Sequence, residues 1–155
     1  MKILIADDSE LKITELKAFF ESGDFCMSSS NIYVAKSFKT TVNSIVNEDL
    51  DLVILDMTMP AHENSKYTSS MKPRALAGKD VLATVNYNRI EGVKFIIFSQ
   101  FGEFGRKDDI ISLEDICADL FVSFPELVCG FVKFNSASSL WKKEMNELIK
   151  AEFLK

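Results

Sequence analysis

The chain has 155 residues, 47% of them apolar, with 18 basic and 23 acidic side chains and a formal net charge of −5. This composition excludes a disordered protein and gives no general attraction to nucleic acid. A domain of this length can bury enough surface to be stable without metals or disulfides. The three cysteines form no CxxC pair, and the first apolar run is too short for a signal peptide or a membrane span. We therefore expect a cytoplasmic protein whose cysteines are small buried hydrophobic residues.

Short apolar runs alternate with stretches of helical spacing, which is typical of a parallel sheet with connecting helices. Five runs predict strands, and they occupy residues 2–6, 32–35, 51–56, 94–98 and 130–132. The third run is the clearest, because four consecutive apolar residues suit a strand that is covered on both faces. Helical spacing follows the first two strands. The last segment, from Ser136 to Lys155, predicts an amphipathic helix with one apolar stripe, formed by Leu140, Trp141, Met145, Leu148, Ile149 and Phe153.

Two connections are longer than the roughly 2–6 residues usual for loops in such folds. We interpret them as insertions at about 61–77 and about 103–127. In the second, Ser112 with Asp115 three residues later resembles a capping box that opens a helix, and Pro125 predicts a break before the last strand. Nothing indicates a repeat or a linker, so residues 1–155 are expected to form a single domain.

Polar residues stand at the ends of four of the five predicted strands. Asp7 and Asp8 follow the first strand, Asp56 the third, Ser99 the fourth and Lys133 the fifth. Ligands bind at this edge of an open parallel sheet. Converging carboxylates repel one another unless a cation lies among them, and Mg²⁺ prefers such oxygen ligands. Asp56 could then attack phosphorus as a nucleophile, with Lys133 and Ser99 stabilising the phosphoryl oxygens.

These residues, together with the string LVILDMTMP at residues 52–60, resemble the response-regulator receiver family over nearly the whole chain. The resemblance implies an α/β, flavodoxin-like (βα)5 three-layer sandwich, whose five-stranded parallel sheet has strand order 2-1-3-4-5. It implies Mg²⁺ bound by Asp8, Asp56 and the backbone carbonyl of Thr58, with Asp7 assisting. It also implies that Asp56 is the phosphoacceptor, that Ser99 is the switch hydroxyl, and that Lys133 stands at the position of the family's conserved lysine.

The resulting hypothesis is a stand-alone receiver that accepts a phosphoryl group on Asp56 from a histidine kinase or a histidine phosphotransfer protein. It would pass the signal to a downstream protein target by contact or as a homodimer, without binding nucleic acid directly and without membrane insertion. We expect self-phosphorylation and autodephosphorylation rather than turnover of a free substrate. The alternative is a degenerate receiver that acts as a phosphorylation-independent interaction module, with Gln100, Phe101 and the long loops forming a static docking surface. A phosphatase of the haloacid-dehalogenase kind would need a second aspartate where the chain has Thr58.

Overall fold

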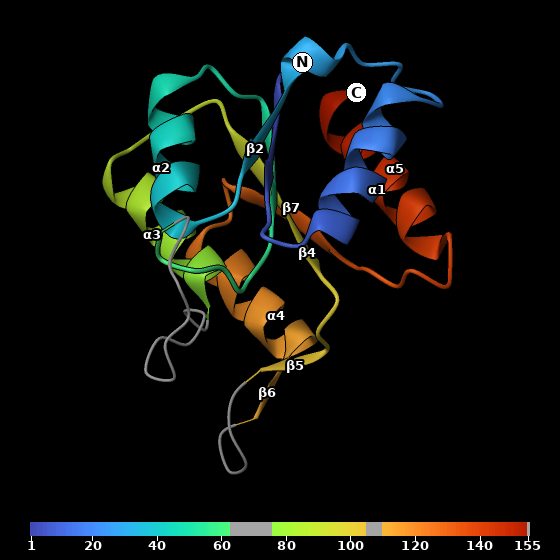
Figure 1. Ribbon diagram of the computed structural model, residues 1–155. Helices are drawn as coiled ribbons and strands as arrows, with labels where there is room; N and C mark the ends of the chain where they lie inside the picture. The colour runs from blue at the N-terminus through green and yellow to red at the C-terminus, as the bar shows by residue number, and fades with distance from the viewer. Residues whose placement is uncertain (63–75, 105–109, 155) are drawn as a thin grey trace.

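A five-stranded parallel sheet forms the centre of the computed structural model, which describes residues 1–62, 76–104 and 110–154 (Figure 1). The strands lie in the order β2-β1-β3-β4-β7. Their bounds are β1 (Ile3–Ala6), β2 (Ile32–Ala35), β3 (Leu52–Leu55), β4 (Lys94–Ser99) and β7 (Val128–Lys133). Counted along the chain within this sheet, the order is 2-1-3-4-5, which confirms the predicted topology.

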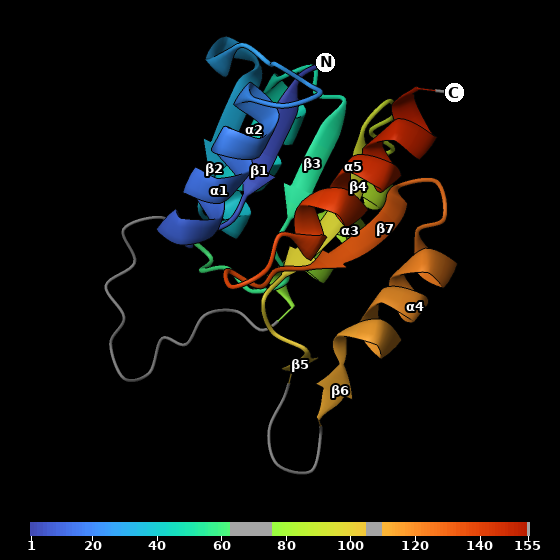
Figure 2. The ribbon, with the colours of Figure 1, turned by 90° about the vertical axis from the view of Figure 1, so that its right-hand side faces the viewer.

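Helices cover both faces of the sheet (Figures 1 and 2). On one face lie α1 (Glu10–Glu21) and α5 (Leu140–Phe153), and on the other lie α2 (Phe38–Asn47), α3 (Ala77–Tyr87) and α4 (Leu113–Ser123). A 3₁₀ turn (Ser29–Asn31) precedes β2, and a small antiparallel pair, β5 (Glu103–Phe104) with β6 (Ile111–Ser112), precedes α4. The predicted three-layer sandwich is therefore confirmed.

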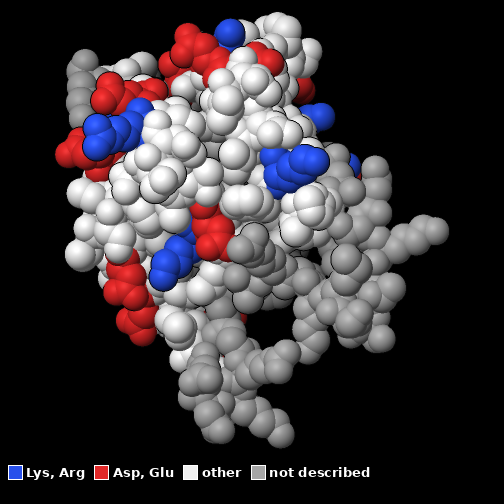
Figure 3. Space-filling model, turned by 90° about the vertical axis from the view of Figure 1, so that its left-hand side faces the viewer, with Lys and Arg blue, Asp and Glu red and all other residues white. Residues whose placement is uncertain are grey.

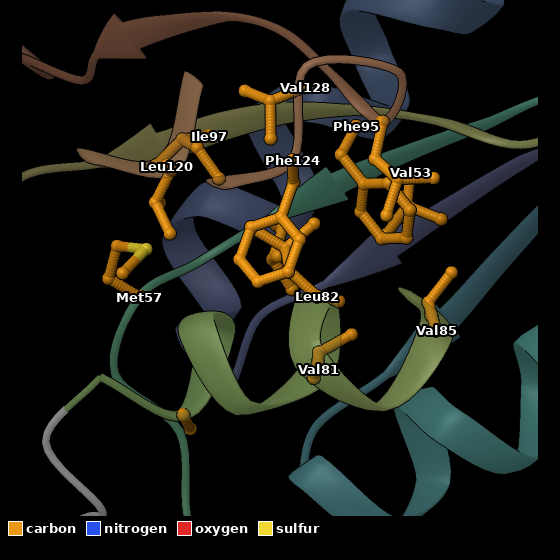
Figure 4. Close-up of a cluster of buried hydrophobic side chains, with 14 of the residues drawn as sticks. Val53, Met57, Val81, Leu82, Val85, Phe95, Ile97, Leu120, Phe124 and Val128 are labelled. Atoms are coloured by element: carbon orange, nitrogen blue, oxygen red, sulfur yellow. The ribbon is translucent and has the colours of Figure 1, made fainter. Parts of the chain in front are cut away.

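The central strands are apolar along their whole length because both of their faces are buried. Successive side chains alternate between two hydrophobic clusters, so that Val53 faces α2, α3 and α4 whereas Ile54 faces α1 and α5. Figure 4 shows the first cluster, in which sheet residues meet side chains of α3 and α4. The labelled members are Val53, Met57, Val81, Leu82, Val85, Phe95, Ile97, Leu120, Phe124 and Val128.

The second cluster is rich in aromatic rings and connects β4 to α5. The Trp141 ring centroid lies 5.3 Å from that of Phe98 and 5.6 Å from those of Phe19 and Phe134. The ring planes are tilted or edge-on to one another, which is the favourable arrangement for aromatic pairs. Because Phe98 precedes Ser99, this cluster fixes the end of β4 against the last helix.

The structure confirms some local predictions and corrects others. Ser112 is the N-cap of α4, where its Oγ accepts a hydrogen bond from the Asp115 N–H at 3.1 Å. Leu140 is 59% exposed, so it lies outside the buried stripe of α5, because it is the first residue of that helix and faces solvent. Cys26 is also exposed, contrary to expectation, since it lies in the turn after α1 rather than in a packed element.

Most of the first predicted insertion, residues 63–75, lies outside the described residues. The second, at about 103–127, contains β5, β6 and α4, and α4 crosses from β4 back to β7. Within the described part of the chain, no helix is both long enough and apolar enough to cross a membrane.

Candidate functional site

Asp7 and Asp56 are neighbours because β1 and β3 are adjacent and in register, with Ala6 opposite Leu55. Each aspartate is the first residue after its strand, and the Asp56 N–H donates a hydrogen bond of 2.9 Å to the Ala6 carbonyl. Carboxylate oxygens of Asp7, Asp8 and Asp56 lie within 4.8 Å of one another. Asp7 and Asp56 are buried, whereas Asp8 is exposed. The structure thus brings together the three carboxylates that the sequence analysis singled out.

A fourth charged group lies in this cluster and was missed by the sequence analysis. The Lys12 Nζ lies 2.7 Å from Asp7 Oδ2 and 3.2 Å from Asp56 Oδ2, and the lysine side chain is 2% exposed. Lys12 belongs to the first turn of α1, whose N-cap is Ser9. A signal was present in the sequence, because Lys12 lies four residues before the buried Leu16 and so on the apolar face of the helix.

Burial controls the electrostatics of the two inner carboxyl groups. The pKa of Asp56 is raised to about 7, mainly by burial and next by the neighbouring Asp7, against the opposing effect of Lys12. Burial also raises the pKa of Asp7 above its usual value, against the opposing effects of Lys12 and of the Ser9 N–H, which donates to Asp7 Oδ1 at 2.9 Å. Asp56 Oδ1 is buried and has no hydrogen-bond partner among the described residues. A buried oxygen of this kind favours the approach of a further cation or donor.

Ser99 and Lys133 reach the same edge of the sheet, since they lie opposite each other at the ends of β4 and β7. The buried Ser99 Oγ accepts a hydrogen bond from the Phe101 N–H at 3.2 Å. Lys133 is exposed, and its Nζ lies only 2.9 Å from where a Cβ on Gly102 would be. Within the described residues Ser99 and Lys133 share this edge of the sheet with the carboxylate cluster but form no hydrogen bond or ion pair with Asp56.

The segment that follows Asp56 is fixed by backbone hydrogen bonds to α2. The Phe38 N–H donates to the Pro60 carbonyl at 2.9 Å, and the Lys39 N–H donates to the Ala61 carbonyl at 3.1 Å. Thr58, whose carbonyl is the predicted metal ligand, is half-buried in this segment. The free N–H groups of a helix terminus are thus satisfied by the loop, which limits how far the loop can move.

Gly78, in the first turn of α3, packs directly against the backbone of the candidate phosphoacceptor. A Cβ at this position would lie 2.8 Å from the Asp56 carbonyl oxygen and 3.1 Å from the Met57 Cα. The Gly78 N–H also donates a hydrogen bond of 3.1 Å to the Met57 carbonyl. Only glycine allows this close approach, so α3 and the end of β3 are held in fixed relation.

The donor set fits a hard divalent cation. Asp7, Asp8 and Asp56 supply only carboxylate oxygens, and oxygen atoms are the ligands that Mg²⁺ prefers. The buried Asp56 Oδ1, which has no hydrogen-bond partner in the described part of the chain, is available for an additional contact. The cluster is therefore chemically suited to Mg²⁺, although two of its oxygens already contact Lys12.

The chain resembles known proteins in sequence and in fold, although no family model matches it. It is 36% identical over 147 residues to the Detocs response regulatory protein DtcB of Enterobacter cloacae, covering 94% of this chain and 95% of that protein. A CheY-like response regulator receiver domain protein from Methanospirillum hungatei has a TM-score of 0.58 at 19% identity, covering 99% and 98% of the two chains. The signal receiver domain of a putative Luxo repressor protein from Vibrio parahaemolyticus has a TM-score of 0.56 at 18% identity, covering 97% and 96%.

Proposed function

Because the chain belongs to the response-regulator receiver family, we propose that it is a phosphorylation-dependent switch whose phosphoacceptor is Asp56. The observation that carries this proposal is the position of Asp56 at the end of β3, buried, with Oδ1 unpartnered among the described residues. Asp7 and Asp8 lie beside it within 4.8 Å. We further propose that residues 1–155 act as one receiver domain.

The reaction that this geometry supports is transfer of a phosphoryl group from a phosphohistidine of a histidine kinase or histidine phosphotransfer protein. An Asp56 carboxylate oxygen attacks phosphorus, an O–P bond forms, and the N–P bond of the donor breaks. The imidazole nitrogen leaves with the electron pair of that bond and takes a proton from solvent. Hydrolysis of the acyl phosphate by water returns the carboxylate and releases inorganic phosphate.

Asp7, Asp8 and Asp56, with the Thr58 carbonyl, are the residues that we propose as ligands of Mg²⁺. When bound, Mg²⁺ would neutralise negative charge on the phosphoryl oxygens. Ser99 and Lys133 are the groups that we propose to contact the remaining phosphoryl oxygens after a shift toward Asp56. Ser99 must exchange its contact with the Phe101 N–H for one with the phosphoryl group, and this exchange couples the site to the segment after β4.

The outgoing signal is proposed to pass by protein contact, to a downstream protein or to a second copy of the chain. On the surface in Figure 3, which lies on the side of α2 and α3, the described basic and acidic side chains are interspersed rather than gathered into one basic patch. The net charge of −5 supports a protein partner rather than direct binding of nucleic acid. The three free cysteines fit the cytoplasm, which we propose as the compartment.

The test is a two-dimensional NMR titration with Mg²⁺ and then with beryllium fluoride, which mimics an acyl phosphate on the aspartate. Trp141 fluorescence provides a second readout, because this ring contacts Phe98 and Phe98 precedes Ser99. The expected result is saturable amide shifts around Asp8, Asp56, Ser99 and Lys133 that are absent in Asp56→Asn. Magnesium binding without any response to beryllium fluoride would contradict the phosphoacceptor role.

One observation favours a second candidate, the phosphorylation-independent interaction module. Lys12 already supplies a positive charge between Asp7 and Asp56, so the cluster is partly neutralised without metal or phosphoryl group. A site balanced in this way needs neither a metal ion nor a phosphoryl group to keep its charged side chains buried. The same titration separates the two candidates, since the interaction module predicts no response to beryllium fluoride.

A further inference from the structure

Lys12 is the one buried basic residue in the part of the chain that the structure describes. Its ammonium group contacts Asp7 Oδ2 and Asp56 Oδ2, and it lies 6.0 Å from the centroid of the Phe98 ring. The side chain thus ends between two carboxylates and above an aromatic face, both of which attract a cation.

Two physical costs oppose this location. A buried ammonium loses its hydration, and a positive charge in the first turn of a helix faces the positive end of the helix dipole. The helix begins with a regular N-cap, in which Ser9 Oγ accepts a hydrogen bond from the Lys12 N–H at 3.4 Å. Lys12 therefore reaches this position without any distortion of the helix backbone. Its attraction to Asp7 and Asp56 is what offsets both costs.

The atoms that Lys12 contacts are among those that a metal ion would need. Asp7 Oδ2 and Asp56 Oδ2 face the ammonium, and Asp7 Oδ1 accepts from the Ser9 N–H. That leaves Asp56 Oδ1 and the exposed Asp8 as carboxylate donors that the lysine does not contact. A divalent cation and the Lys12 ammonium would repel each other at the contact distances of this cluster.

We propose that Lys12 is a tethered cation that competes with Mg²⁺ for Asp7 and Asp56 and must withdraw from at least one of them when the metal binds. In the metal-free protein it holds the phosphoacceptor in an ion pair, and it lowers the affinity of the cluster for Mg²⁺. This inference rests on the proposed function only in taking the three carboxylates as the metal site. It makes Lys12 a positioning residue of that site.

The test compares Mg²⁺ binding by the wild-type protein, Lys12→Met and Lys17→Met, with amide shifts as the readout. Methionine keeps an unbranched chain of similar length without the charge. Lys17→Met is the matched control, because Lys17 is exposed on the same helix and its loss changes the net charge equally. We expect the Mg²⁺ dissociation constant of Lys12→Met to be lower than that of the wild type by about tenfold or more, and that of Lys17→Met to be nearly unchanged. Equal or weaker binding by Lys12→Met, or no binding by either protein, overturns the proposal.

A second measurement uses the wild-type protein and does not depend on the variant folding. We expect burial and the two ion pairs to slow proton exchange at the Lys12 ammonium, so that its side-chain ¹⁵N signal can be followed during the Mg²⁺ titration. We expect this signal to shift or vanish in step with the amide shifts of Asp8 and Asp56. A Lys12 signal that stays unchanged at saturating Mg²⁺ refutes the proposed withdrawal.

Beryllium fluoride separates this proposal from the proposed function. If Lys12→Met gains Mg²⁺ affinity but neither protein responds to beryllium fluoride, Lys12 competes with metal in a site that does not accept phosphoryl groups. If both respond to beryllium fluoride with the same Mg²⁺ affinity, Asp56 is a phosphoacceptor and the inference about Lys12 is wrong.

Discussion

Replacing the Asp56 carboxyl group by an amide is expected to stabilise the metal-free protein at neutral and alkaline pH. Burial raises the pKa of Asp56 from 3.8 to about 7, so the folded protein binds this proton more tightly than the unfolded chain does. Below the unfolded value both states are protonated and the group costs nothing. As the pH rises toward about 7, the unfolded chain has lost the proton while the folded protein retains it, and the free energy of unfolding falls.

The size of this effect follows from the two pKa values. At about 1.4 kcal/mol for each pKa unit, the difference between 3.8 and about 7 corresponds to about 4 kcal/mol. Asp56→Asn removes the ionisable group, so its free energy of unfolding should exceed that of the wild type by about 4 kcal/mol at about pH 8. At about pH 4, just above the unfolded pKa of 3.8, the difference between the two proteins should be well under about 1 kcal/mol.

The assay is urea unfolding followed by Trp141 fluorescence, in buffers that contain a chelator to exclude divalent cations. Trp141 is 2% exposed in the folded protein, so unfolding changes its environment strongly. Asp119→Asn is the control, because this exposed aspartate of α4 carries the same charge and lies outside the carboxylate cluster. A gain at pH 8 no larger than at pH 4, or a gain equal to that of the control, would refute the reasoning.

Three further predictions concern packing, thiol reactivity and the lifetime of the phosphorylated state. Gly78→Ala should lower the free energy of unfolding by about 1–3 kcal/mol, because its Cβ would lie 2.8 Å from the Asp56 carbonyl; an unchanged urea midpoint would contradict this. A thiol reagent should label the exposed Cys26 in the native protein and Cys117 only after unfolding, since burial raises the pKa of Cys117 to about 12; equal labelling rates would be the contrary result. The acyl phosphate lifetime should be shorter in Phe101→Ala, because this ring lines the same surface hollow as Lys133 and would shield the site from water; an unaltered lifetime would show no such shielding.

The strands could be predicted because each central strand is buried on both faces and therefore reads as an unbroken apolar run. The exception is β7, which begins at Val128 although the sequence analysis placed it at residues 130–132. Gly130 interrupts its apolar run, and the reason lies in α5. A Cβ on Gly130 would lie 2.7 Å from a methyl group of Leu148, so the helix occupies the space that a side chain would fill. A contact between residues this far apart cannot be deduced from local spacing.

The acidic part of the candidate site was predictable for the same reason as the fold. Parallel strands end at one edge, so aspartates that follow two adjacent strands must meet there. The positions of Ser99 and Lys133 were predictable only as far as the edge itself. Where their polar atoms lie depends on the segment after β4, since the Phe101 N–H donates to Ser99 Oγ and the absence of a side chain at Gly102 leaves room for Lys133 Nζ.

The sum of the charges around Lys12 indicates more about the site than its metal ligands alone do. Above about pH 7, where Asp56 is ionised, the carboxylates of Asp7, Asp8 and Asp56 and the ammonium of Lys12 carry two net negative charges, which one Mg²⁺ balances. Phosphorylation changes the charge at Asp56 from one negative charge to about −2 and so leaves one negative charge in the metal-bound site. Lys133, which we propose to contact the phosphoryl oxygens, would supply the positive charge that neutralises it. Without Lys12 the metal-bound site would already carry one negative charge before any phosphoryl group arrives, so the buried lysine makes the need for Lys133 depend on phosphorylation.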